Sequence, residues 1–180
     1  MEKILSSPKI KKILRKHKKK LEKDLDITIK EEKNEVTLEG NDAYNEYLGR
    51  NILEAIDMGF KVEESLMLLH EDYMFEQMNI RDYARPSRVK TVKGRVIGRE
   101  GKAKKVVEGL TDCSIVVHDN IIGIIGKTEN VDLAVKAVRS ILLGSPHSSV
   151  YALLEKSQGR LKEAKREQEE FEEEMSKKEK

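Results

Sequence analysis

The sequence is poor in several residue types, and each shortage excludes a class of protein. Its 180 residues include one cysteine, three prolines, five tyrosines, three phenylalanines and no tryptophan. Because Cys113 is the single cysteine, an intramolecular disulfide and a metal site built from several cysteines are both excluded. So few prolines also exclude collagen-like and proline-rich disordered chains.

Long apolar runs are missing as well. No stretch approaches the roughly 18 uninterrupted apolar residues that a membrane span needs. The N-terminal segment carries charge, but it has no apolar block long enough for a secretory signal. We therefore expect a cytoplasmic protein with no membrane partner.

The charge is unevenly distributed, although the net charge is only +2. Residues 1–20 contain nine lysines and arginines against one acid, and residues 31–80 contain thirteen acids against three bases. Residues 81–105 are basic again, with ten bases against two acids. Two basic blocks of this density are typical of a polyanion binder, but solvated helix faces can look the same. Charge alone does not decide between these interpretations.

One structural pattern occurs twice along the chain. Two β-rich runs, joined by a short turn, are followed by a helical segment that ends at a glycine, Gly59 in the first copy and Gly144 in the second. Glycine suits the C′ position, where a left-handed residue closes a helix. The first copy comprises residues 25–28, 35–39 and 41–58, and the second comprises residues 113–117, 121–125 and 129–143.

Helical patterns and one further strand precede each copy. The strands are expected at residues 2–6 and 74–83, and a break at residues 98–101 divides the second helical pattern into two helices. The repeated module is therefore predicted to have the order helix–helix–strand–strand–helix, with one strand ahead of it. We predict an α+β fold with two modules, each a three-stranded antiparallel sheet with helices on one face. Because the intervening residues 59–72 are helical and apolar, the modules should pack into one body. Residues 157–180 are almost all charged or polar and predict a solvent-exposed helix.

The sharpest local feature is the segment VIGREGK, residues 96–102. Gly98 and Gly101 interrupt a helix–helix pattern, so the backbone can turn tightly and approach a sugar–phosphate chain without a Cβ clash. Amides at the start of the following helix then face the phosphate. A P-loop is excluded because the spacing fails and because Ala103 stands where Ser or Thr should bind Mg²⁺.

Aromatic residues distinguish two ways of binding RNA. Modules that stack bases on a sheet need exposed Phe or Tyr on adjacent strands, and residues 114–117 and 121–125 contain none. A base would therefore lie against aliphatic side chains while the G-x-x-G loop holds the nucleic-acid backbone. KH domains bind about four nucleotides in this way.

The VIGREGK loop, the SIVV/IIGIIG hairpin and the following helix resemble a type I KH domain. Together with the element GSPHSSVYALLEK at residues 144–156, they resemble one KH family in particular. This is the archaeal and eukaryotic small-subunit ribosome-assembly family known as the partner of the Nob endonuclease. The resemblance covers residues 74–156. It implies two KH units, single-stranded rRNA near the 3′ end of the small subunit, and the Nob-type endonuclease, with other assembly factors, as partners.

On this basis the chain divides into a degenerate KH-like module at residues 1–72, a KH domain at residues 73–156 and a charged helical tail at residues 157–180. The first module has no G-x-x-G, because the corresponding segment reads LRKHK. Its lysines are expected either to contact phosphate without sequence preference or to serve a structural, protein-facing role. The residues expected to bind RNA are Arg95, Val96, Ile97, Gly98, Arg99, Glu100, Gly101, Lys102, Lys104, Lys105, Ile115 and Val117.

The other reactive side chains favour ordinary roles. Cys113 is expected to be buried, and His147 is expected to cap the next helix or contact RNA. The four histidines show no ligand spacing, and no catalytic triad, paired carboxylate or H-E-x-x-H group is evident. We expect no enzyme activity, cofactor, metal or small-molecule substrate. Two alternatives stay open, a KH-fold protein scaffold and an exosome-type KH subunit, although the SPH-x-x-VY element argues against the second.

Overall fold

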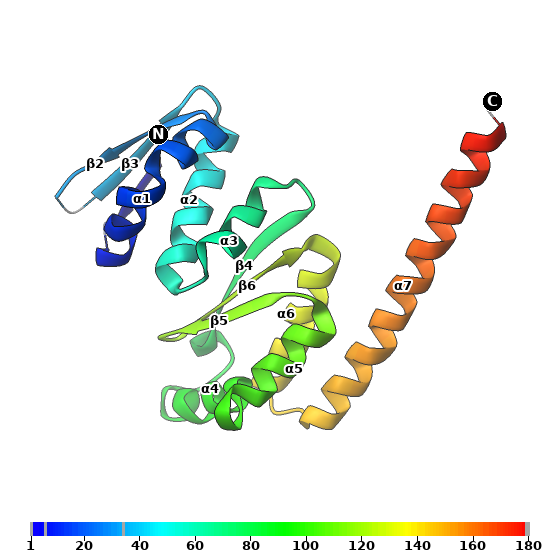
Figure 1. The fold of residues 1–180 in the computed structure, drawn as a ribbon. Coiled ribbons are helices and arrows are strands. Elements are labelled where there is room, and N and C mark those ends of the chain that lie inside the picture. Colours follow the sequence, from blue (N-terminus) through cyan, green and yellow to red (C-terminus); the bar gives the residue numbers. More distant parts are fainter. Residues whose placement is uncertain (1, 6, 34, 179–180) are drawn as a thin grey trace.

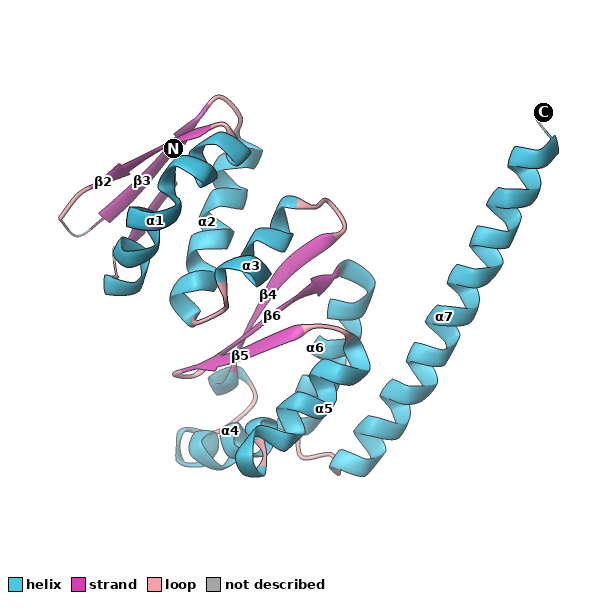
Figure 2. Cartoon of the chain, in the orientation of Figure 1, coloured by secondary structure: helices cyan, strands magenta, loops and turns pink. Residues whose placement is uncertain are grey.

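The computed structural model describes residues 2–5, 7–33 and 35–178. Two modules follow one another along the chain, and each ends in a strand–strand–helix unit (Figures 1 and 2). The first module comprises β1 (Glu2–Leu5), α1 (Pro8–Leu25), β2 (Ile27–Glu31), β3 (Glu35–Gly40) and α2 (Ala43–Met58). A linker with α3 (Val62–Leu66) leads to β4 (Tyr73–Asn79), α4 (Val89–Ile97), α5 (Lys102–Thr111), β5 (Ser114–His118), β6 (Ile121–Lys127), α6 (Thr128–Leu142) and α7 (His147–Lys178).

Both sheets have three antiparallel strands, and in each the last strand lies in the centre. The orders are β1-β3-β2 and β4-β6-β5. In the second sheet Ile122 pairs with Met78 on one side and with Val117 on the other. The predicted fold class, two type I KH-like modules with antiparallel three-stranded sheets, is confirmed.

The first module has one helix where the sequence pattern predicted two. Helix α1 is capped by Ser7, whose hydroxyl accepts a hydrogen bond from the Ile10 amide at 3.1 Å, and Pro8 is its first residue. It runs for 18 residues without a break, because this segment contains no glycine that could stop the helix midway. A G-x-x-G loop therefore has no counterpart here.

Strand and helix ends largely follow the sequence signals. Gly59 and Gly144 have φ angles of 115° and 104°, as predicted for residues that close helices. Strand β4 ends at Asn79, earlier than predicted, because the Asn79 side chain accepts a hydrogen bond from the Arg81 amide at 3.0 Å and starts a 3₁₀ turn. Strand β1 ends at Leu5, and the predicted last residue, Ser6, lies outside the described residues.

Strand β6 joins the two modules. Ile122 and Ile124 are fully buried against α4, α5 and α6, and Ile125 on the other face of the strand belongs to the core of the first module. On that second face, a Cβ built on Gly123 would lie 2.8 Å from Phe60 and 2.9 Å from Met58. The linker and the end of α2 therefore cover the face of the second sheet that its own helices leave open.

The C-terminal helix starts on the second module and then leaves it. Val150 and Leu154 are buried near its start, and the remainder extends away from both sheets (Figure 1). It passes residue 157 without interruption. Within the part of the chain that the structure describes, no helix is both long and apolar enough to cross a membrane.

The contact at Gly123 makes a prediction about stability. Replacing Gly123 by Ala should lower the free energy of unfolding by about 1–3 kcal/mol, because the new methyl group overpacks the junction between the modules. Gly109→Ala is the matched control. Nothing lies within 4 Å of a Cβ at this position in α5, so alanine should raise stability by about 0.5–1 kcal/mol. Urea denaturation of both variants checks this, and equal effects would contradict the packing argument.

Candidate nucleic-acid interface

The G-x-x-G loop is a single tight turn between α4 and α5. Gly98 has φ 74° and ψ 173°, Gly101 has φ 76° and ψ 10°, and Glu100 between them is also left-handed at φ 54°. The amide of Gly101 donates to the carbonyl of Gly98 at 3.2 Å. A conformation like that of Gly98 is essentially restricted to glycine, whereas the conformation of Gly101 is also tolerated by asparagine.

The two glycines have different reasons to be glycine. A Cβ on Gly98 would lie 2.6 Å from both the amide nitrogen and the Cβ of Ala103, so Gly98 lets the end of α4 pack onto the start of α5. A Cβ on Gly101 would meet nothing within 4 Å. The backbone around Gly101 is therefore open to a ligand, as the sequence argument requires.

Charged side chains surround this open backbone. Arg99, Glu100, Lys102 and Lys105 are exposed. Lys102 lies 3.8 Å from Glu100, with both side chains about three-quarters exposed (74% and 76%), so the pair contributes little. Gly101 offers no side chain to cap α5. The Lys102 amide donates to the Arg99 carbonyl, and because α5 has no side-chain cap, the amides that follow Lys102 can face an external anion.

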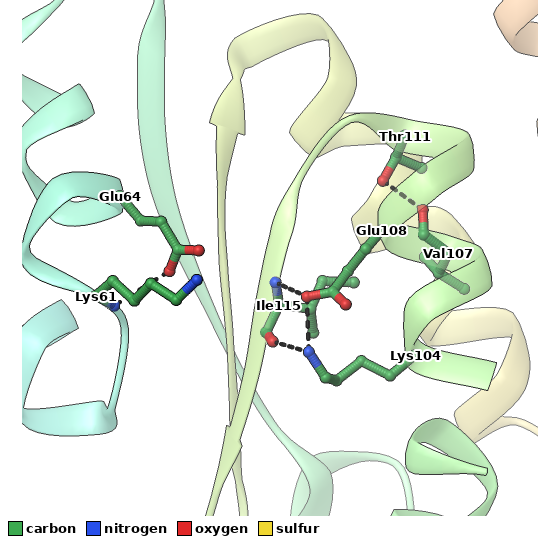
Figure 3. A network of polar contacts seen from close by, with 7 residues as sticks. All are labelled: Lys61, Glu64, Lys104, Val107, Glu108, Thr111 and Ile115. Carbon is green, nitrogen blue, oxygen red and sulfur yellow. Dashed lines mark hydrogen bonds and ion pairs between the residues drawn. The ribbon is translucent and has the colours of Figure 1, made fainter. Parts of the chain in front are cut away.

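Two of the bases expected to contact RNA have partners within the chain. Lys104 donates from Nζ to Glu108 at 2.7 Å and to the carbonyl of Ile115 at 2.8 Å (Figure 3). The same carboxylate accepts from the Ile115 amide at 2.8 Å, so this network ties α5 to β5. Arg95 donates from Nη2 to the carbonyl of Ser145 at 2.7 Å.

His147 supports Arg95 and is not a cap for its own helix. It is the first residue of α7, and its Nε2 lies 2.9 Å from the Arg95 carbonyl, to which it donates. This contact fastens the end of α4 to the SPH element. Helix capping, the role favoured from sequence, is therefore replaced by a bond between elements that are distant in sequence.

The apolar residues of the candidate site divide into two layers. Val96 and Ile115 are 2% and 1% exposed and belong to the core of the second module. Ile97 and Val117 are only half-buried. Only these two can meet a base, while Val96 and Ile115 support them from below.

A groove of about 640 Å³ lies between the start of α4 and the β5–β6 turn. Lys93 spans it, donating from Nζ to the carbonyl of Asp119 at 2.7 Å. Three residues of the groove are bases, and none of them is among the residues predicted from sequence to bind RNA. The missed signal is helical spacing, since Lys90, Lys93 and Ile97 share one flank of α4. The groove is lined by Arg81, Pro86, Val89, Lys90, Lys93 and Asn120.

The second sheet offers no surface for stacking bases. Its aromatic residues, Tyr73 and Phe75, pack against the first module, and the rings of Phe60 and Phe75 meet edge-to-face at 5.9 Å. Cys113 is buried as predicted, and burial raises the pKa of its thiol to about 11. Over residues 2–5, 7–33 and 35–178, no group of three or more potential metal-ligating side chains is found.

A family model described as "Eukaryotic type KH-domain (KH-domain type I)" and named for the second KH domain of PNO1 matches residues 74–159. The KH domain-containing protein MJ0443 of Methanocaldococcus jannaschii is 35% identical over 154 residues, which cover 82% of this chain and 68% of that protein. The chain belongs to the PNO1/Dim2 family of pre-rRNA-processing KH proteins.

Two other PNO1/Dim2 relatives extend the comparison. The RNA-binding protein pno1 of Drosophila melanogaster is 36% identical over 131 residues, which cover 68% of this chain and 52% of that protein. The chain thus spans about half the length of this relative. The Dim2p structure from Pyrococcus horikoshii OT3, solved in complex with a/eIF2alpha and rRNA, superimposes with a TM-score of 0.76 at 29% identity and covers 88% of this chain and 94% of that one.

The glycine geometry of this PNO1/Dim2 loop predicts unequal effects of substitution. Gly98→Ala should cost about 2–4 kcal/mol of stability, because backbone strain adds to a clash with the Ala103 backbone. Gly101→Ala should cost only about 1–2 kcal/mol, since strain acts there alone. Chemical denaturation measures both. A Gly101 variant less stable than the Gly98 variant would contradict the assigned loop packing.

Proposed function

We propose that this PNO1/Dim2 protein is a non-catalytic ribosome-assembly factor that binds single-stranded rRNA near the 3′ end of the small subunit. The observation that carries the proposal is the G-x-x-G loop, where exposed backbone, a helix N-terminus and exposed basic side chains meet beside the half-buried aliphatic residues Ile97 and Val117. The Pyrococcus relative with the same fold was solved together with rRNA, which supports RNA as the ligand.

Each residue of the site receives a role from its environment. Gly98 and Gly101 let the RNA backbone approach, while Arg99, Lys102 and Lys105 bind phosphate. The bases rest on the half-buried residues Ile97 and Val117. Arg95 and Lys104 were counted from sequence as RNA contacts. Because Arg95 Nη2 and Lys104 Nζ donate to carbonyls within the chain, we infer that these two bases hold α4 and β5 in position.

Glu100 lowers the affinity for RNA without abolishing binding. Its carboxylate is exposed beside the phosphate path and repels it, but the grip relies mainly on backbone groups. Glu100 has a left-handed backbone conformation in the turn, and aspartate adopts this conformation as readily. Glu100 can therefore be replaced by aspartate without altering the loop.

The protein partners are inferred from the family resemblance. The family resemblance supports cooperation with a Nob-type endonuclease, and with other assembly factors, in the cytoplasm. The first module, with its uninterrupted α1, has no loop for a nucleic-acid backbone and would contribute a structural or protein-facing surface. The same feature favours the second candidate function, a KH-fold scaffold that binds only proteins.

The central prediction concerns the loop itself. Replacing Arg99 and Glu100 together by aspartate should weaken binding of small-subunit 3′-end rRNA by about 100-fold or more, through lost charge-assisted hydrogen bonds and added repulsion. Fluorescence anisotropy at physiological salt measures this. The matched control, Arg160→Asp with Glu163→Asp on α7, makes the same replacements on exposed residues away from the loop and should bind like the wild-type protein.

Two outcomes would overturn the proposal in different ways. If the Arg99/Glu100 variant bound rRNA as well as the wild-type protein, the assignment of the groove would be wrong. If the wild-type protein itself bound no rRNA, the protein scaffold would be the better interpretation.

Two neighbouring lysines are expected to have different roles: Lys104 supports the fold, and Lys105 binds RNA. Lys104→Ala should lower the free energy of unfolding by about 1–2 kcal/mol, because the Ile115 carbonyl and the Glu108 carboxylate lose a partner. Lys105→Ala should leave stability within about 0.5 kcal/mol and reduce the salt dependence of RNA binding by about 0.7 in the slope of log K against log salt. Urea denaturation and salt titration test the pair, and the reverse pattern would contradict these roles.

A further inference from the structure

A second basic cavity lies on the other flank of α4, away from the groove. It has a volume of about 520 Å³ and opens between the start of α4 and the end of α6. We call it the arginine pocket. It is lined by Tyr83, Ala84, Arg85, Arg88, Thr91, Val92, Arg95, Leu142, Leu143 and Gly144.

Within the described residues, acidic side chains do not neutralise the positive charge of this pocket. From Tyr83 to Arg99 the sequence contains six bases and no acid: Arg85, Arg88, Lys90, Lys93, Arg95 and Arg99. Among the described residues, no ion pair involves Arg85 or Arg88. By contrast, Arg50 in the first module is paired with both Glu2 and Glu54. Clustered charge without counter-charges favours an external anion.

Several backbone acceptors near the pocket are already occupied. At the end of α6, the carbonyls of Arg139, Ser140 and Ile141 accept from the amides of the turn that follows. The carbonyl of Ser145 accepts from Arg95. Arg85 and Arg88 are both exposed at the pocket, and within the described residues neither guanidinium donates a hydrogen bond.

The pocket and the groove lie on two flanks of a single helix, α4. Lys90 and Lys93 lie on the flank of α4 that faces the groove, whereas Arg88 and Arg95 lie on the flank that faces the pocket. Only the width of one helix, about 10 Å, separates the two surfaces. The surface between them, at the start of α4, carries Pro86 and Ser87 and no acid.

We propose that a single-stranded RNA held by the G-x-x-G loop continues around the N-terminal end of α4 and places a phosphate between Arg85 and Arg88. This inference rests on the proposed function and extends the footprint beyond the four nucleotides of a KH grip. Arginine suits the role, because its planar guanidinium binds phosphate oxygens in pairs. Leu143, which is 67% exposed at the edge of the pocket, offers an apolar surface to the adjoining base.

The position of the two surfaces on either flank of α4 favours RNA over an acidic protein segment as the ligand. Both surfaces belong to one basic stretch of sequence that contains no acid. An RNA chain that leaves the groove at the start of α4 reaches Arg85 and Arg88 next. A protein ligand would instead bind the pocket independently of RNA length. The length of the RNA is therefore the variable that tests the proposal.

The test uses the full chain and single-stranded RNAs of 4, 6, 8 and 10 nucleotides taken from the 3′ end of small-subunit rRNA. For the wild-type protein we expect affinity to rise about tenfold between the short and the long RNAs. The slope of log K against log salt should steepen by about 0.7 for each added phosphate contact. Arg85→Gln with Arg88→Gln should remove this gain and leave binding of the 4-nucleotide RNA unchanged.

The matched control removes two arginines elsewhere, with Arg160→Gln and Arg166→Gln on α7. It should keep the full length dependence. The proposal is overturned if wild-type affinity does not rise with length, if the Arg85/Arg88 variant keeps the gain, or if that variant weakens all lengths equally. Failure of the proposed function has a different signature, because the wild-type protein would then bind none of the RNAs.

Discussion

Burial of β6 on both faces is the constraint on which the rest of the structure depends. An antiparallel strand with one solvated face alternates apolar and polar residues, whereas β6 reads IIGIIG and is almost wholly buried. Ile122 and Ile124 anchor the helices of the second module, and Gly123 and Ile125 receive the first module. One strand thus belongs to two hydrophobic cores and holds the modules together.

Because of this arrangement, the two faces of the second sheet and the G-x-x-G loop have different roles. Since the outer face of the second sheet is occupied by Phe60 and its neighbours, it is not available to nucleic acid. The candidate interface therefore lies on the helical side, which carries α4 and the G-x-x-G turn. Burying Val96 and Ile115 beneath that surface keeps the turn in place relative to the strand.

Electrostatics divide the molecule in the same way. In the first module basic side chains meet acids, as in the pair Lys30–Glu39 across two strands. Around α4 the bases lack such partners, apart from those that bond backbone carbonyls. The near-zero net charge therefore combines an acidic middle segment with two basic segments, and the second basic segment carries the G-x-x-G turn.

Much of the fold could be predicted from the sequence, because periodicity and glycine positions act locally. Alternation and apolar runs located the strands, Gly59 and Gly144 marked helix ends, and the VIGREGK motif placed the turn between α4 and α5. The single helix α1 was missed because the module was assumed to repeat completely. The groove bases Lys90 and Lys93 were missed as site residues because only the fold brings the β5–β6 turn opposite them.

By itself, the sequence determined the type of each module, the position of the G-x-x-G turn and the segregation of charge. These properties depend on residues that are neighbours along the chain. Only the tertiary structure decided which bases are free. Arg95 and Lys104 look like Arg99 and Lys105 in sequence, yet carbonyls of Ser145 and Ile115 occupy the first pair. Such a difference depends on contacts between distant segments, which local pattern does not encode.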